Sequence, residues 1–531
     1  MSSRGDTIQV SPQEGFTGGR NPWAIALTVT LATFMEVLDT SIANVSLPHI
    51  AGNLSVSQDE STWVLTSYLV SNAIVLPVSG WFATKFGRKR FYMASVAMFT
   101  VSSLLCGLAP NLGLLILFRV LQGLGGGGLA PSEQAILADT FPPQKRAIAF
   151  SVYAMAVVLA PAIGPTLGGF ITDHYSWRWV FFINVPVGLV SLFLSNRMVT
   201  DPPHLVEANK RMSGIDYVGL GLIAVGLGAL ELVLDKGQED DWFHSSTITA
   251  FSVIAAVALL SFVIWEWNHK RPVVDVRLFK SRNFAVANLM MLVLGITLYG
   301  STVLLPQYLQ VWMGYSATNA GMALSPGALV FVCITPVIGW LVSRVGSKPL
   351  IAFGFIVLAV ALYHMSHTLY AGIDFSTAVW MRIYLTIGLA FLFVPINTVV
   401  YAGVPLEKNN AVAGIVNLSR NMGGDIGIAM VTTIIARRTQ LHHERIVSHL
   451  FAGAQDFNAK LSGIAHALER AGMSTVEASK QAYGAIYRQV IQQAQTLAYL
   501  DTLFVFACFA ALMVPLVLLT KQARGRAAAG H

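Results

Sequence analysis

Two stretches of the chain that lie 259 positions apart are nearly the same in sequence. Residues 77–89 read PVSGWFATKFGRK, and residues 336–348 read PVIGWLVSRVGSK. In both copies an apolar run ends in a short basic loop that contains a glycine. A parallel duplication within a hydrophobic chain is typical of membrane transporters built from two similar halves around a central site. We therefore predict two similar bundles of membrane helices.

The composition agrees with a chain that lies in a membrane. Of the 531 residues, 54% are hydrophobic and only 11% are charged, whereas about 25% are charged in a typical soluble domain. Apolar runs of roughly 20 residues can cross a bilayer as helices. We predict an all-α polytopic protein whose surroundings are the lipid bilayer. The fourteen predicted spans are 23–47, 61–83, 91–109, 111–133, 147–171, 177–197, 214–235, 246–267, 284–310, 318–341, 349–367, 376–400, 411–435 and 498–520.

The distribution of basic residues predicts the orientation. Of the 34 Lys and Arg residues, 22 lie in alternate short segments that include both termini, and only Arg178 and Lys236 lie in the opposite short loops. Cations gather on the cytoplasmic side of membrane proteins. We therefore expect both termini in the cytoplasm and the chain in the inner (cytoplasmic) membrane. The net charge of +7 then reflects topology, and we predict no nucleic-acid partner.

The period of the duplication is longer than six helices need, so two further helices are expected between the halves. The predicted regions are a cytoplasmic tail (1–22), a first six-helix bundle (23–197), a cytoplasmic linker (198–213), two inserted helices (214–267), a cytoplasmic loop (268–283), a second six-helix bundle (284–520) with an external lobe (436–497), and a cytoplasmic tail (521–531).

No pattern indicates a metal, a cofactor or an enzyme. Cys106, Cys333 and Cys508 all lie in apolar helices and are read as small core residues. His364 and His367 are one turn apart but have no Cys or carboxylate nearby in the sequence. No nucleophile–base pair is evident. A membrane-embedded enzyme is therefore a weak alternative.

Ionisable residues within the membrane are costly and mark candidate functional sites. Asp39 and Arg119 each lie about eight residues from the outer end of a predicted span, which is about 12 Å at 1.5 Å per residue. The shared depth permits a buried pair, either static or involved in proton transfer. Glu36 is one turn away on the same face as Asp39. Two carboxylates so close repel when both are ionised, which suits groups that bind and release a proton.

Two later spans also carry ionisable residues. Arg420 is expected near the middle of the membrane, facing the interior, and Asp425 is either a second titratable group or the neutralising partner of an arginine. Arg382 and Glu231 lie nearer the outer interface, where snorkelling is the expected explanation.

The fourth and fifth predicted spans contain runs of small residues. Four glycines occupy residues 125–128, where we expect close approach to a neighbouring helix. Residues 160–169 read APAIGPTLGG, and we expect Gly164, Pro165, Gly168 and Gly169 to form a close, leak-tight contact between the two halves.

Four motifs together resemble the fourteen-helix drug:proton antiporters of the major facilitator superfamily, EmrB/QacA type. They are LDTSIANVSLP at 38–48, RVLQG at 119–123, GPTLGG at 164–169 and WRWVFFINVPVG at 177–188. The resemblance covers nearly the whole chain. It implies the major facilitator fold and export of hydrophobic or amphipathic compounds in exchange for protons, with Asp39 and Arg119 in proton coupling. We expect Glu36 to take part as well, because of its position beside Asp39. The proton gradient would drive transport without a cofactor.

The resemblance also implies that the two duplicated loops gate the cytoplasmic side. The residues concerned are Gly80, Lys85, Gly87, Arg88, Lys89, Gly339, Arg344 and Gly346. The family usually has an acid where this chain has Thr84. The usual latch is therefore in question, and we expect Lys85, Arg88 and Lys89 to dock against helix ends or carboxylates of the other half.

The lobe at 436–497 resembles that of EmrB-like members that work with a periplasmic adaptor and an outer-membrane channel, and the alternative is a lobe that caps the outer cavity.

Two other functions compete with export. A proton-coupled uptake symporter is disfavoured by GPTLGG at 164–169, and a non-transporting sensor with the same fold would not need Asp39 or Arg119.

Overall fold

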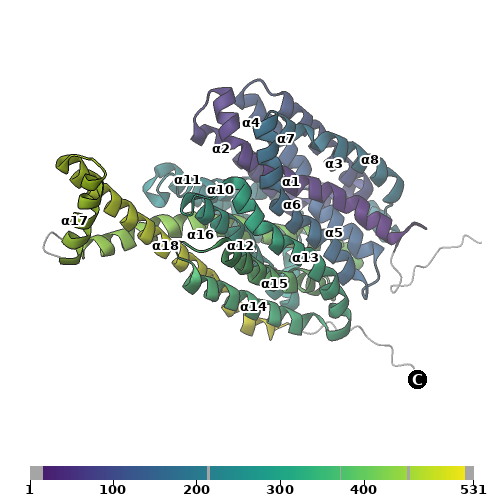
Figure 1. Ribbon diagram of the computed structural model, residues 1–531. Helices are drawn as coiled ribbons and strands as arrows, with labels where there is room; N and C mark the ends of the chain where they lie inside the picture. Colours follow the sequence, from purple (N-terminus) through teal and green to yellow (C-terminus); the bar gives the residue numbers. More distant parts are fainter. Residues whose placement is uncertain (1–15, 212–215, 371, 451–454, 521–531) are drawn as a thin grey trace, which may run out of the picture.

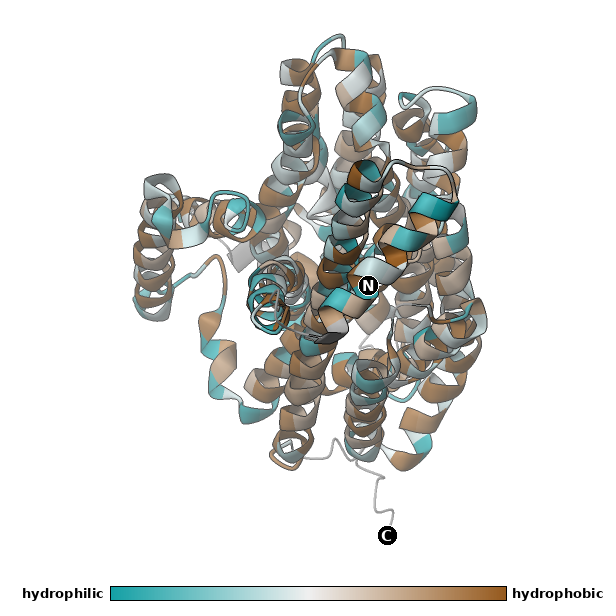
Figure 2. Ribbon diagram, turned by 60° about the vertical axis from the view of Figure 1, so that its left-hand side comes forward, coloured by the Kyte–Doolittle hydropathy of each residue, from teal (hydrophilic) through white to brown (hydrophobic). Residues whose placement is uncertain are grey.

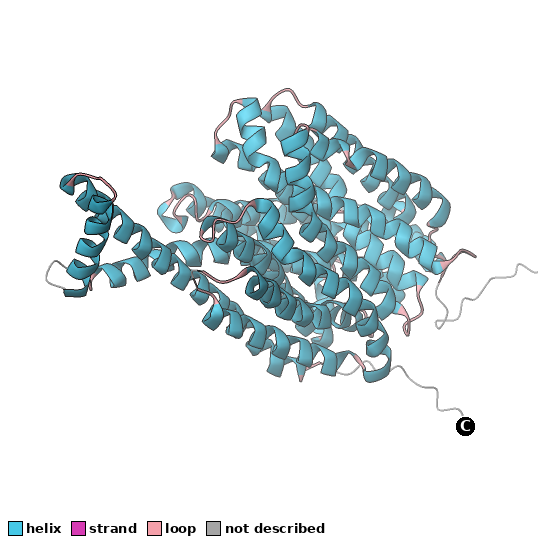
Figure 3. Cartoon of the chain, in the orientation of Figure 1, coloured by secondary structure: helices cyan, strands magenta, loops and turns pink. Residues whose placement is uncertain are grey.

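The structure is a computed structural model that describes residues 16–211, 216–370, 372–450 and 455–520. These parts consist of helices joined by short loops, with no strand in the ranges given (Figure 3). The predicted all-α class is thereby confirmed. The predicted tail 521–531 and parts of the regions 1–22, 198–213 and 436–497 lie outside the described residues.

The first half of the chain forms the helices that contain the predicted spans one to six. They are α1 (Pro22–Leu54), α2 (Gln58–Phe86), α3 (Arg88–Leu108), α4 (Leu112–Gly126), α5 (Leu129–Thr140), α6 (Arg146–His174), α7 (Trp179–Phe182) and α8 (Asn184–Met198). The fourth span is divided into α4 and α5 at the glycine run. A Cβ on Gly125 would lie 2.7 Å from Phe99 N, and one on Gly127 would lie 2.7 Å from Asn72 O. The expected close approach to neighbouring helices is confirmed.

The remaining helices follow the order that the sequence predicts. They are α9 (Pro203–Arg211), α10 (Tyr217–Lys236), η1 (Trp242–His244), α11 (Ser246–Asn268), η2 (Val276–Lys280), α12 (Arg282–Val311), α13 (Ala317–Val345), α14 (Ser347–Thr368), α15 (Phe375–Val400), η3 (Leu406–Lys408), α16 (Asn409–Val447), α17 (Gln455–Arg470) and α18 (Thr475–Val517).

Among the described residues, 13 spans are long and apolar enough to cross a membrane. The α16 helix is the fourteenth long helix. It is more polar than the others because it carries groups such as Arg420 and Asp425, yet it packs along α12, α2 and α18 inside the bundle (Figure 1). Apolar side chains are exposed on the bundle, as on α11, where they include Val257, Leu260 and Ile264. Hydrophobic residues colour much of the bundle brown (Figure 2). This surface suits a lipid environment.

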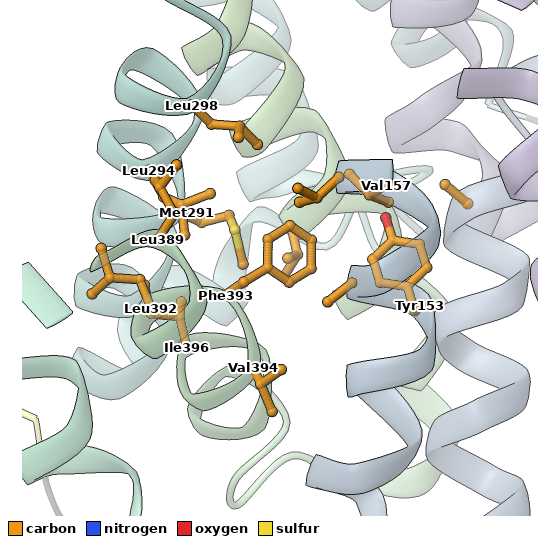
Figure 4. Close-up of a cluster of buried hydrophobic side chains, with 14 of the residues drawn as sticks. Tyr153, Val157, Met291, Leu294, Leu298, Leu389, Leu392, Phe393, Val394 and Ile396 are labelled. Carbon is orange, nitrogen blue, oxygen red and sulfur yellow. The ribbon is translucent and has the colours of Figure 1, made fainter. Parts of the chain in front are cut away.

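The two halves contact each other through a repeated pair of helix packings. The α2 helix, with the first copy of the duplicated sequence, packs against α16, and α13, with the second copy, packs against α6. Apolar side chains fill the space between them, where Tyr153 and Val157 of α6 approach Phe393 of α15 and Leu298 of α12 (Figure 4). The inserted helices α10 and α11 pack against each other, and α10 packs on α2.

The last two long helices extend well beyond the bundle. Beyond the predicted spans 411–435 and 498–520 the helices continue into the predicted lobe, because α16 ends at Val447 and α18 begins at Thr475. These extensions and α17 form a protruding lobe (Figure 1). At the base of the lobe, His442 Nε2 lies 2.9 Å from an oxygen of Asp501 and joins the two long helices.

The tightest helix packing in the second half yields a stability prediction. A Cβ on Gly423 of α16 would lie 2.1 Å from Leu292 O of α12, whereas a Cβ on Gly221 of α10 would have no atom within 4 Å. We expect Gly423→Leu to lower the free energy of unfolding by more than the roughly 1–3 kcal/mol of ordinary overpacking, because backbone must move. Gly221→Leu is the control. Thermal unfolding of the purified variants would contradict this packing if both melted at the wild-type temperature.

Candidate functional site

A buried ion pair lies between the first and fourth membrane spans. Arg119 Nη1 of α4 is 2.6 Å from Asp39 Oδ2 of α1, and both side chains are completely buried. Arg119 Nε also donates to the carbonyl of Val64 on α2 at 2.9 Å. The structure thus brings together two of the residues that the sequence proposes for proton coupling.

Two amides that the sequence analysis missed complete the surroundings of Asp39. Gln122 Nε2 and Asn184 Nδ2 donate to Asp39 Oδ1 at 3.0 and 2.6 Å. Asn184 is brought in by α8, and its amide also donates to Ser103 Oγ. Both amides stand within the motifs at 119–123 and 177–188, so the motifs held the signal. The carboxylate accepts three hydrogen bonds, one from Arg119 and two from these amides.

Glu36 faces α2, whereas the ion-pair partner of Asp39, Arg119, lies on α4. Glu36 Oε1 accepts from Asn72 Nδ2 at 3.0 Å and from the Tyr68 hydroxyl at 3.4 Å, while Oε2 is buried without a hydrogen-bond partner in the described chain. The ring of Tyr68 also lies under the Arg119 guanidinium, 4.3 Å from its centroid. Tyr68 therefore connects Glu36 to the ion pair.

Arg420 lies where the two halves meet. Its Nη1 donates to the Tyr153 hydroxyl of α6, which in turn donates to Asn417 Oδ1 at 2.9 Å. No carboxylate lies within 4.0 Å of Arg420 in the described parts of the chain, but Glu36 and the fully buried Glu133 act on it electrostatically. Arg420 thus faces the interior, as expected, and links α16 to the first half. Sequence analysis missed Glu133.

Asp425 neutralises no arginine in the described chain. Its carboxyl group lies near that of Glu231 on the inserted helix α10, and the two groups act on each other electrostatically. The snorkelling interpretation is wrong for Glu231 and Arg382, which are 2% and 7% exposed. Both face the protein interior.

The glycines of the fifth span do not contact the other half. A Cβ on Gly164 would lie 2.2 Å from Ser41 Oγ, and one on Gly168 would lie 3.0 Å from Ile42 Cγ2, both on α1 of the same half. Nothing lies within 4 Å of a Cβ on Gly169. The expected contact between halves is therefore wrong for these glycines. Contacts across the interface come from other α6 residues, because a Cβ on Gly321 of α13 would meet Thr166 Oγ1 at 2.8 Å.

The first duplicated loop is tied to both halves. Arg88 Nη1 is 2.7 Å from Asp139 Oδ2, and its Nε donates to Asn410 Oδ1 at 2.7 Å. Asn410 in turn donates to Thr84 Oγ1 at 3.3 Å. Asn410 is at the start of α16, so Arg88 reaches the other half as expected, with a neutral threonine contact beside it. Lys89 does not, since its Nζ donates to the carbonyl of Asn196 in the same half.

The matching glycines of the two copies play matching parts. A Cβ on Gly80 would lie 2.7 Å from Asn410 O, and one on Gly339 would lie 2.9 Å from Ile148 Cα, in each case on the opposite half. Gly87 and Gly346 follow with φ of +87° and +88°, a backbone conformation that favours glycine. The basic residue of the second copy makes a contact of its own: the Arg344 guanidinium stacks on the ring of Trp340, 4.2 Å from the ring centroid.

Two similar helical halves that meet at paired glycine contacts, with buried ionisable groups between the spans, define a polytopic membrane transporter. A family model described as "Major Facilitator Superfamily" matches residues 29–428. The chain therefore belongs to the major facilitator superfamily. The proton:xylose symporter XylE shares this fold, with a TM-score of 0.62 and 14% identity over 95% of this chain and 97% of that one.

Relatives within the superfamily are similar over nearly their whole length. The multidrug export protein EmrB of Escherichia coli (strain K12) is 36% identical over 506 residues, which are 95% of this chain and 96% of EmrB. The fatty acid resistance protein FarB of Neisseria gonorrhoeae is 36% identical over 508 residues, covering 96% and 97%. The EmrB-like resemblance of the motifs is confirmed.

The contact between α1 and α6 yields a prediction within one motif. Gly164→Leu is expected to push α1 away from α6 beside Ser41, two residues from Asp39, and so to reduce export of a fluorescent dye such as ethidium at least tenfold. Gly169→Leu, with open space around it, should export at nearly the wild-type rate. Dye efflux from cells with matched expression would contradict this role if the two variants behaved alike.

Proposed function

We propose that the protein is a proton-driven exporter of hydrophobic or amphipathic compounds in the inner membrane, with both termini and the duplicated gate loops in the cytoplasm. The fully buried Asp39–Arg119 pair is the observation that carries this proposal. The similarity to the multidrug export protein EmrB supports the direction and the class of substrate. The proton gradient supplies the energy, and no cofactor is needed.

Asp39 is the proposed proton carrier. A proton on its carboxyl group would cancel the charge that holds Arg119, and Arg119 would then turn toward neutral partners. Arg119 Nη2 is buried without a hydrogen-bond partner in the described chain, so this nitrogen can donate a new hydrogen bond. Loss of the proton to the cytoplasm would restore the ion pair and reset the first half. Glu36 is reached through Tyr68 and is a second proposed carrier.

The direct test replaces the acid and follows transport. Asp39→Asn keeps hydrogen-bonding groups but removes the charge, so we expect gradient-driven export to fall at least a hundredfold while substrate binding persists. Asp173→Asn is a matched control, since Asp173 is an exposed acid that lies 3.6 Å from His49. Export from proteoliposomes with an imposed pH gradient measures the effect, and it also gives the direction of transport.

A static role for the ion pair predicts a different outcome. Removing one partner of a buried pair costs about 3–5 kcal/mol. If the role of Asp39 were purely structural, Asp39→Asn would lower the melting temperature and the substrate affinity together with export. Normal gradient-driven export by Asp39→Asn would remove Asp39 from the mechanism.

The lobe is the proposed docking surface for a periplasmic adaptor that leads to an outer-membrane channel. It stands clear of the bundle (Figure 1) and exposes Tyr483 and Tyr487 on α18. Ile446, Phe457 and Val490 line a groove between α16, α17 and α18, together with polar residues such as Lys460 and Gln489. Exposed aromatic side chains and a groove of mixed apolar and polar lining are typical of protein interfaces.

Removal of the tip of the lobe separates docking from transport. Replacing residues 448–489 with a Gly/Ser linker spares His442 and Asp501 at the base, so the bundle should fold. Export by single-membrane vesicles is expected to survive, whereas drug resistance of intact cells and adaptor pull-down should be lost. Unchanged pull-down would place the docking surface elsewhere, and lost export by vesicles would indicate a lobe that caps the cavity.

A further inference from the structure

A small cavity lies between the two halves on the side of α15 where that helix begins. Its walls come from α6 of the first half and from α12, α13 and α15 of the second, and they include Val157, Pro161, Leu298 and Leu324. These walls are apolar except for a few groups, and the charged one is Arg382. Val157 and Leu298, both labelled in Figure 4, also belong to the apolar cluster between the halves.

Arg382 has only neutral partners in this cavity. Its Nη1 and Nη2 donate to Ser301 Oγ at 3.3 Å and to Thr302 Oγ1 at 3.2 Å, and its Nε is buried without a hydrogen-bond partner in the described chain. No carboxylate lies within 4.0 Å of it among the residues that the structure describes. The side chain is 7% exposed.

Two other buried arginines, Arg119 and Arg88, each have the carboxylate partner that Arg382 lacks among the described residues. Arg119 has Asp39 at 2.6 Å, and Arg88 has Asp139 at 2.7 Å. A buried guanidinium is costly unless an anion and further hydrogen bonds offset its desolvation. A planar guanidinium with an open N–H matches the oxygens of a carboxylate, sulfonate or phosphate group. Among the residues that the structure describes, Arg382 thus lacks the carboxylate partner that Arg119 and Arg88 have.

We propose that Arg382 binds the anionic head of an amphipathic substrate, whose apolar part lies against Val157, Pro161 and Leu298. The inference rests on the proposed export function and names a substrate class for it. Because α6 and α15 belong to opposite halves, such a ligand contacts both of them at once. Its binding and release are then tied to the movement of the halves.

The test compares two probes that have the same dodecyl chain and head groups of opposite charge. Dodecanesulfonate stays anionic at every working pH, which separates its binding from proton transfer, and dodecyltrimethylammonium is its cationic counterpart. Binding of each labelled probe to the full-length protein in nanodiscs is measured with empty nanodiscs subtracted. Arg382→Gln is expected to weaken dodecanesulfonate at least tenfold and to leave the cation unchanged or tighter. Arg382→Lys, which keeps the charge but not the planar guanidinium, should bind dodecanesulfonate more tightly than Arg382→Gln and more weakly than the wild type.

Several results would overturn the proposal. These are unchanged dodecanesulfonate affinity in Arg382→Gln, an equal loss of both probes, and methanesulfonate binding as tightly as dodecanesulfonate, which would leave no role for the apolar wall. If Arg382→Gln does not fold, Ala162→Phe tests the same cavity from the other half. It fills the lining at Ala162 without removing charge and should also weaken dodecanesulfonate at least tenfold, and wild-type affinity in that variant would overturn the site.

The outcome is separable from that of the proposed function. Gradient-driven export of dodecyltrimethylammonium by Arg382→Gln would leave proton-driven export standing even if the anion site failed. Conversely, tight dodecanesulfonate binding by a wild-type protein that shows no gradient-driven export would support the anion site and reject the exporter.

Discussion

The ion pair between Asp39 and Arg119 fixes several helices of the first half at once. Arg119 also bonds to the backbone of α2 through Val64, and Asp39 accepts from Asn184 of α8. Separating these helices would leave a charge buried without its partner, at a cost of about 3–5 kcal/mol. The first half is therefore held together as one unit, which rigid-body rocking of two halves requires.

The contact between the halves is built from weaker interactions. Apolar packing and hydrogen bonds such as those from Tyr153 to Asn417 and from Asn410 to Thr84 join the two sides. Neutral hydrogen bonds of this kind contribute about 0.5–1.5 kcal/mol each. Arg88 reaches Asn410 but keeps its acid, Asp139, within its own half. The halves can thus part at the gate without leaving an arginine unpaired, and the neutral Thr84 fits this arrangement.

The sequence predicted the features that periodicity and spacing encode, and it failed where side-chain direction decides. The duplication and the apolar runs predicted the two bundles and the fourteen long helices, and equal depth predicted that Asp39 and Arg119 can meet. The direction of Gly164 toward α1 depends on how α6 is rotated, which small residues on several faces do not specify. Arg382 and Glu231 were misplaced because distance from the membrane surface does not reveal whether a side chain faces lipid or protein. Gln122 and Asn184 stood in recognisable motifs, but their side chains are neutral. The high cost of a charge inside the membrane, which singled out the ionisable residues, does not apply to them.

The buried charges are divided unequally between the halves. In the first half, Arg119 and Arg88 have their own acids. In the second, Arg420 and Arg382 lie at the interface without a carboxylate in ion-pair contact among the described residues. Arg420 instead feels Glu36 and Glu133 of the first half. The cation and the acids that attract it thus belong to different bundles, and this attraction joins the two halves together with the hydrogen bond from Arg420 to Tyr153.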